Sequence, residues 1–203
     1  MATWSLRDSS KTARESKYTF FKSSEIDIAQ VKPGENVKLI FDFVSEDPEA
    51  PEAERMWVIV DEISKDGTFI GRLDNTPRWI KDLLLGDTIT FDSRHIINTE
   101  HDNPDNLVNK YAKRCFVTNK ILLDTQRIGY LYREEPDTKE DSGWRFMVGD
   151  ETDEYMENSD NLQFVSIGAV LSRDDSALSL LEEPAGSTFE RIAESGVFRR
   201  VET

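Results

Sequence analysis

The sequence predicts an α+β protein of two small domains, each a mainly antiparallel, strongly bent sheet with one or two short helices. Short stretches of alternating apolar and polar residues recur along the chain, separated by turn-forming Gly, Pro, Asn and Asp. Helix signals are few and short. A polar, proline-containing stretch near the middle, EHDNPDNLVN, interrupts the pattern. We therefore expect domains at 1–99 and 113–203, joined by a linker at 100–112.

Two short helices are expected at the start of the first domain. The first spans 6–17, with Ser5 as its N-cap. The second spans 24–31, and Ser24 with Asp27 three residues later matches a capping box. A Lys-Pro-Gly-Glu turn at 32–35 follows, because Pro fixes φ at its second position and Gly accepts a positive φ at its third.

The rest of the first domain reads as strands. The clearest is the first, in which Val37, Leu39, Phe41 and Phe43 alternate with polar residues and face one side. A Lys-Asp-Gly hairpin turn separates the second from the third. The expected strands are 37–43, 55–63, 68–73, 88–91 and 94–97.

The second domain is expected to open with a hairpin, with strands at 115–123 and 127–132 and a turn at 124–126. A further strand follows, with Trp144 and Phe146 on one face. The remaining expected elements are that strand at 143–148, a helical turn at 150–157, a strand at 162–167, a helix at 172–181 capped by Ser172, and a closing hairpin of 187–192 with 197–201.

The charge of the chain limits its partners. The net charge of -15 and the pI near 4.6 argue against binding of nucleic acid and of anionic membranes, since both need clustered Lys and Arg. Residues 134–160 hold eleven Asp or Glu and only two basic residues, so nine of the fifteen excess negative charges lie there. Such a run is compatible with a basic protein partner, and equally with a solubilising surface.

The single cysteine, Cys115, excludes an intramolecular disulfide and fits a reducing compartment. No run approaches the roughly 20 apolar residues of a membrane span, and the first residues lack a signal-peptide core. We therefore expect a cytoplasmic protein.

No convincing catalytic set is visible, and we expect no enzyme, no cofactor and no metal. His95 and His101 lack metal-ligand spacing, and Cys115 beside Phe116 and Val117 reads as core. The segment from Asp150 faintly resembles a calcium loop but has Tyr155 where Gly is needed. A looser divalent-cation site, or acid/base chemistry by the carboxylates, stays open as an alternative.

Aromatic residues are interleaved with the acidic run. Trp144, Phe146, Tyr155 and Met156 either fill the core or line a protein-binding face on which aromatic residues anchor and charges steer. The sequence leaves both interpretations open.

The second half resembles the bacterial domain-of-unknown-function family 2185, which is also counted among immunity proteins of polymorphic-toxin systems. The similar stretches are V-x-N-K-I, I-G-Y-x-Y-R-E-E-P, D-S-G-W-R-F, G-D-E-T-D-E-Y, and the closing P-x-G and F-E-R. The first half resembles domain-of-unknown-function family 2314, through Y-T-F, the stretch from K-P-G, M-W-V, G-R-L-D-N and G-D. Neither resemblance brings a catalytic residue.

The resemblance implies an immunity protein that binds and neutralises a cognate toxin, and the acidic run suggests a basic, nuclease-like one. The alternative is a stand-alone small-ligand or metal-binding regulatory module. The expected partner-binding residues are Glu134, Glu135, Asp141, Trp144, Asp150, Glu151, Asp153, Glu154 and Tyr155.

Overall fold

The computed structural model describes residues 3–202 and has the predicted α+β class, with two six-stranded sheets and short helices. The chain divides between Pro104 and Asp105 into two compact units. This division lies inside the segment 100–112, part of which forms the helix α3 (Leu107–Lys110).

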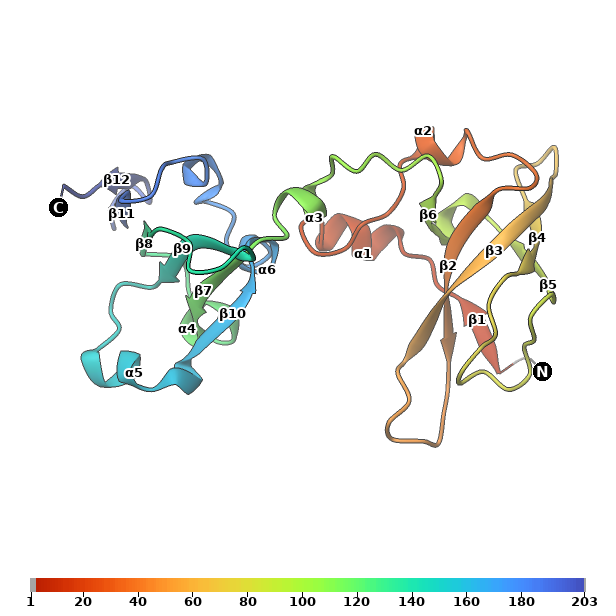
Figure 1. The fold of residues 1–203 in the computed structure, drawn as a ribbon, viewed down its shortest axis with the longest axis horizontal. Helices are drawn as coiled ribbons and strands as arrows, with labels where there is room; N and C mark the ends of the chain where they lie inside the picture. Colours follow the sequence, from red (N-terminus) through yellow and green to blue (C-terminus); the bar gives the residue numbers. More distant parts are fainter. Residues whose placement is uncertain (1–2, 203) are drawn as a thin grey trace. The chain divides into compact units, whose positions relative to one another are not determined.

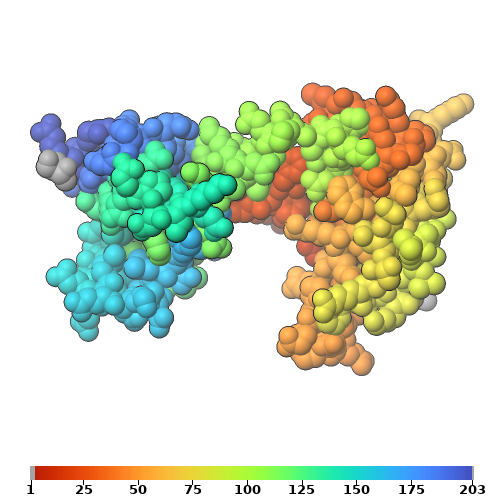
Figure 2. All heavy atoms as spheres, viewed as in Figure 1, coloured from red at the N-terminus to blue at the C-terminus, as the bar shows by residue number. Residues whose placement is uncertain are grey.

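The first unit is a strongly curled antiparallel sheet of order β1-β2-β3-β4-β5, with β6 also paired to β2. Its strands are β1 (Trp4–Leu6), β2 (Asn36–Phe43), β3 (Ala53–Ile63), β4 (Phe69–Leu73), β5 (Thr88–Phe91) and β6 (Ile96–Thr99). One edge of β2 pairs with β3, so β1 and β6 share its other edge. Register shifts in the β2–β6 and β3–β4 pairs increase the curl, which Figure 1 shows. Figure 2 shows the loop between β2 and β3, in orange, standing out from this unit.

The predicted alternation of the first long strand is confirmed for Val37, Leu39 and Phe41, which are buried, while Phe43 is only partly buried. The capping box is also confirmed, since Ser24 accepts from the backbone of Asp27 and the Asp27 carboxylate accepts in return. It begins α2 (Glu25–Ile28).

The helix predicted at 6–17 is wrong at its start. The residues from Trp4 to Leu6 form β1, and the helix α1 spans only Ser10–Glu15. Strand pairing prevails here because it places the Trp4 ring 5.3 Å from the ring of Phe41. Near 94–97, a single turn of 3-10 helix, η1 (Ser93–His95), replaces the first half of the predicted strand.

The second unit is a sheet of order β10-β7-β9-β8-β11-β12 (Figure 1). Its strands are β7 (Arg114–Thr118), β8 (Tyr130–Arg133), β9 (Asp141–Met147), β10 (Leu162–Ser166), β11 (Thr188–Arg191) and β12 (Phe198–Arg200). Only β7 and β9 run parallel. The helical elements are α4 (Asn119–Leu122), α5 (Asp153–Glu157), η2 (Ser159–Asn161), α6 (Ile167–Leu171) and η3 (Leu178–Leu180). The predicted closing hairpin is confirmed as β11 with β12.

The opening hairpin predicted for the second domain is wrong. Residues 119–122 form α4, and β7 pairs with β9 and β10 instead of β8. The physical reason is burial, because α4 packs against β7 and α6 and fully buries Ile121. A parallel pair also needs a long connection, which the chain between β7 and β9 supplies.

The helix predicted at 172–181 is also wrong. The α-helix in this region is α6, whose N-cap Ser166 accepts from the backbone of Ala169, and it ends at Leu171 with Ser172 as its C-cap. After it, the carboxylate of Asp174 accepts a hydrogen bond from Ile128 N at 3.0 Å and pairs with Arg191 Nη2 at 2.8 Å. These contacts hold the chain in a loop, so the local helix signal is overridden.

Candidate protein-interaction site

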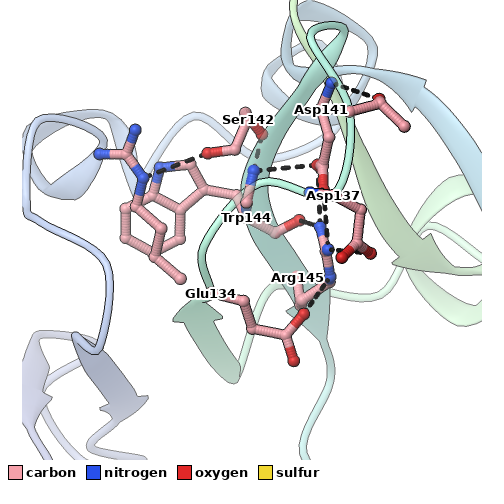
Figure 3. A network of polar contacts seen from close by, with 9 residues as sticks. Glu134, Asp137, Asp141, Ser142, Trp144 and Arg145 are labelled. Atoms are coloured by element: carbon pink, nitrogen blue, oxygen red, sulfur yellow. Dashed lines mark hydrogen bonds and ion pairs between the residues drawn. The ribbon is translucent and has the colours of Figure 1, made fainter.

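The Arg145 guanidinium lies at the centre of a polar network on β9 (Figure 3). Its Nη1 and Nη2 donate to the two carboxylate oxygens of Asp141, at 3.0 and 2.9 Å. Its Nε donates to Glu134 at 2.9 Å, Nη1 also donates to the carbonyl of Trp144, and Asp137 lies 3.8 Å away. One cation therefore faces three carboxylates, and the cluster keeps an excess of negative charge.

The backbone around Gly143 holds Asp141 in place. Asp141 accepts from Gly143 N at 2.9 Å and from Asp137 N at 3.2 Å. Gly143 has a φ of +81°, which lets the chain bend between Asp141 and Arg145 so that the two side chains meet. The hydrogen bonds from Arg145 are the main cause that lowers the pKa of Asp141 from 3.8 to about 2.

This pKa predicts an acid-labile component of stability. The unfolded chain binds the proton more readily than the folded one, so the contribution is present above pH of about 4 and is lost as pH falls towards about 2. The expected loss is roughly 2 kcal/mol of the free energy of unfolding of the second unit. Urea unfolding over this pH range measures it, and the Asp141→Asn variant is the control. Equal pH slopes in the two proteins would contradict the assignment.

Trp144 and Asp141 do not lie where a partner could contact them, which corrects two of the predicted partner-binding residues. Trp144 is 1% exposed, its Nε1 donates to the carbonyl of Leu181 at 3.3 Å, and its ring stacks with Phe146 at 6.0 Å. Asp141 is also 1% exposed and is satisfied by Arg145. The Trp144 ring gains from exclusion of water, whereas the Asp141 carboxylate can stay buried because Arg145 and the backbone N–H of Gly143 donate hydrogen bonds to it.

The other predicted residues lie on or beside two exposed segments. Glu134 and Glu135 are exposed after β8. The remaining five lie between β9 and β10, in residues 148–161, which we call the acidic arm. Figure 2 shows this segment in cyan as a protruding part of the second unit. Asp150, Asp153 and Glu154 are exposed, and Tyr155 is partly buried.

Glu151 fixes the root of the acidic arm. Its carboxylate accepts from Val148 N at 2.8 Å, from Gly149 N at 2.7 Å and from the Thr118 hydroxyl at 2.8 Å. These hydrogen bonds lower the pKa of Glu151 although partial burial opposes them. Glu151 is therefore a structural carboxylate.

Lys120 ties the middle of the arm to α4. Its ammonium group lies 2.7 Å from the Asp150 carboxylate and 5.1 Å from the centre of the Tyr155 ring. Thr152 caps α5 by accepting from Tyr155 N at 3.2 Å. The arm is thus held at defined points, while its outer carboxylates point to solvent.

One face of the second sheet carries partly exposed aromatic residues. Phe164, Phe116, Arg145 and Tyr132 follow one another as cross-strand neighbours from β10 to β8. The Phe116 ring lies 4.8 Å from that of Phe164 and 4.9 Å from the Arg145 guanidinium, and Phe116 is 37% exposed. We call Phe116, Tyr132, Arg145 and Phe164 the aromatic row.

The aromatic row was not predicted from the sequence, although the strands carry a pattern that indicates it. In β7, Cys115 and Val117 are fully buried while Phe116 between them is on the opposite face. The same alternation in β8 buries Leu131 and leaves Tyr132 partly exposed. An aromatic residue between two core positions of a strand is the pattern that would have predicted an apolar second face.

Two protein families match the chain, one over each unit. Residues 4–112 match the family described as "Uncharacterized protein conserved in bacteria (DUF2314)". The chain belongs to this family. Residues 115–202 match the "Immunity protein Imm33 domain", so both predicted resemblances are confirmed, with the name Imm33 where the sequence analysis used family 2185. No curated protein and no solved structure matches the chain.

The DUF2314 unit contains both histidines, and each has a structural contact. His95 Nδ1 accepts from Asp92 N at 3.0 Å, and burial lowers its pKa. His101 Nε2 lies 2.8 Å from the Glu35 carboxylate. In the Imm33 domain, Cys115 is fully buried, and desolvation raises the pKa of its thiol.

Among residues 3–202, no group of three or more His, Cys, Asp or Glu side chains is arranged to hold a metal ion. Over the same residues, no helix has the length and apolar character needed to cross a membrane.

Proposed function

We propose that this chain is a non-catalytic bacterial immunity-type protein that acts in the cytoplasm by binding a cognate toxin domain and neutralising it. The match of residues 115–202 to the Imm33 domain is the observation that carries the proposal.

The contact surface is the acidic arm together with the aromatic row. Asp153 and Glu154 are exposed on the arm, and the residues of the row are cross-strand neighbours on one sheet face. Exposed carboxylates speed the approach of a basic partner, and desolvated aromatic residues hold it once bound. A nuclease-like toxin is basic where it holds phosphate, so a negative surface can occupy that groove.

A pull-down from the native bacterium tests the proposal, with the tagged chain as bait and washes at moderate salt. A stoichiometric partner carrying a toxin domain, whose toxicity is relieved by co-expression of the chain, is the expected result. Absence of such a partner when the neighbouring genes are co-expressed would contradict it and would direct attention to a ligand-binding role.

Charge reversal on the acidic arm should slow association with that toxin. We expect the double variant Asp153→Lys with Glu154→Lys to lower the association rate constant by about tenfold at low salt, because two steering charges change sign. The dissociation rate should change little. Stopped-flow mixing measures both rate constants.

A matched control for this variant is the same double reversal in the loop between β2 and β3, Glu46→Lys with Glu49→Lys, where both side chains are also exposed. It changes the net charge equally but lies in the other unit. Equal slowing by both variants would mean that only net charge matters, and the arm would then lose its place in the contact surface.

A further inference from the structure

A small pocket opens between the aromatic row and the acidic arm. It has a volume of about 250 Å³ and is lined by Phe116, Tyr132, Arg145, Phe146, Met147, Met156 and Leu162. Four strands, β7, β8, β9 and β10, supply six of these residues, while Met156 comes from α5 on the arm. The volume lies below the range of about 300–1,000 Å³ that is usual for small-molecule and cofactor sites. It suits one large side chain.

The lining of the pocket favours an apolar guest. Five of its seven residues are apolar, and the polar group of Arg145 is already satisfied. Its guanidinium donates to both oxygens of Asp141, to Glu134 and to the carbonyl of Trp144. An anionic or strongly polar side chain that entered the pocket would compete for these hydrogen bonds. An apolar side chain would leave them intact and would bury its own apolar surface.

The carboxylates around the pocket favour a positively charged partner segment. Glu134 and Asp137 contact its Arg145 wall, and their side chains are 50% and 81% exposed. On the arm side, exposed Glu154 and Glu157 flank the segment that carries Met156. These carboxylates attract Lys or Arg next to the inserted residue and repel an acidic segment.

We propose that this pocket receives one Phe, Leu or Met side chain from a basic segment of the partner protein, and we call it the anchor pocket. Such a residue is a typical hot spot, namely an apolar anchor in a desolvated pocket surrounded by charge. The identity of the partner rests on the proposed toxin-binding function. The chemistry of the pocket does not, so it can be tested with peptides alone.

The first experiment uses the full chain with ¹³C-labelled methionine methyl groups. The sequence has four methionines, of which Met147 and Met156 line the pocket and Met56 lies in the core of the first unit. The probes are five-residue peptides with a central Phe or Ala between pairs of lysines, and a third with Phe between pairs of glutamates. We expect the lysine–phenylalanine peptide alone to shift the Met147 and Met156 methyl signals, with Met56 unchanged.

Three results would overturn the proposal. One is the absence of shifts at about 10 mM peptide, since a single anchored ring should give at least millimolar affinity. The second is equal shifts with the Ala peptide, which would show that charge alone is responsible for binding there. A shift of the two signals with protein concentration in the absence of peptide would assign the pocket to a second copy of the chain, and would also overturn it.

The second experiment measures the affinity of the Met156→Glu variant for the toxin found by the pull-down. We expect binding weaker by at least about tenfold, because a carboxylate replaces an apolar wall of the pocket. If the arm acted only by charge, the added negative charge would leave affinity unchanged or raise it. Leu123→Glu is the matched control, because it adds the same charge at an exposed apolar residue of the same unit outside the pocket.

The two experiments separate failure of the pocket from failure of the function. Peptide-induced shifts without any toxin partner would keep the anchor pocket and reject the toxin-binding role. A toxin that binds Met156→Glu and wild type equally would reject the pocket while the immunity role stands. The conservative variant Met156→Leu should bind like wild type, since it keeps the apolar wall.

Discussion

Replacement of Arg145 by Met is expected to lower the free energy of unfolding of the second unit by about 3–5 kcal/mol, because it leaves the buried Asp141 carboxylate without its counter-ion. The side chains of Arg145 and Asp141 are 9% and 2% exposed, so water cannot replace the lost hydrogen bonds. Met retains most of the apolar stem of Arg, which keeps the loss of packing small. The effect should therefore report on the charge.

Urea unfolding followed by ¹⁹F NMR of the 5-fluorotryptophan-labelled full chain measures this effect. Trp144 is the single Trp after Asp105, so its signal reports on the second unit, while the other three report on the first. Arg127→Met is the control, since Arg127 is 70% exposed and lies 3.7 Å from Asp174, which keeps Arg191 as a partner. We expect a loss of at most about 1 kcal/mol there.

A second variant shows whether the ion pair itself is needed. The double variant Arg145→Met with Asp141→Leu removes the stranded charge, and we expect it to regain a large part of the lost stability. If the double variant is as unstable as Arg145→Met alone, packing rather than charge determines the loss. That outcome would also weaken the account of the Asp141 pKa.

Local signals predicted the elements that are stabilised locally. The capping box at Ser24 and Asp27 forms as expected, because both partners lie within one turn of chain. The alternation in β2 identified its buried face, because one side of that strand packs on the core. These predictions needed no knowledge of distant residues.

Elements that depend on distant contacts were predicted wrongly. Residues 119–122 were predicted as strand because their apolar run is too short to distinguish a helical from a strand periodicity. The helix forms because it buries Ile121, which the sequence alone does not indicate. The segment after Ser172 has a helix signal that is overridden by Asp174, whose partners Ile128 and Arg191 are remote in sequence. A single sequence does not show which remote residues contact each other, and these contacts determine the structure of both segments.

The residues of the candidate site show the same difference between local and distant determinants. Exposure of Asp153 and Glu154 followed from composition, because a charge cluster of this density stays in water. Burial of Trp144 and Asp141 did not follow, since it requires the bend at Gly143 and the guanidinium of Arg145. The acidic run thus contains two kinds of carboxylate, those that build the network and those that face solvent.

The bend at Gly143 leads to the second large expected effect. Gly143→Ala should lower the free energy of unfolding of the second unit by about 3 kcal/mol or more, through two causes. A φ of +81° costs a residue with a Cβ about 1–2 kcal/mol. In addition, that Cβ would lie 2.2 Å from the carbonyl oxygen of Glu134, which is backbone and cannot rotate away.

Relief of this contact would disturb the surrounding ladder. Glu134 N donates to the carbonyl of Gly143 at 2.9 Å, and the neighbouring pair Arg133 with Trp144 joins β8 to β9. Separation of these strands would move Arg145, which lines the anchor pocket, away from Glu134. Gly143→Ala should therefore also weaken binding of the lysine–phenylalanine peptide, which a purely local loss of stability would leave intact.

Gly186→Ala separates the two causes. Gly186 lies in the same unit with a φ of +86°, but a Cβ there would meet no atom within 4 Å. It carries the conformational cost alone, so we expect a loss of about 1 kcal/mol and unchanged peptide binding. The difference between the two variants, read from the ¹⁹F signal of Trp144, isolates the close approach of Gly143 to Glu134. Equal losses would mean that the strands separate easily at this point, and the bend would then be a tolerant turn instead of the element that fixes Asp141 against Arg145.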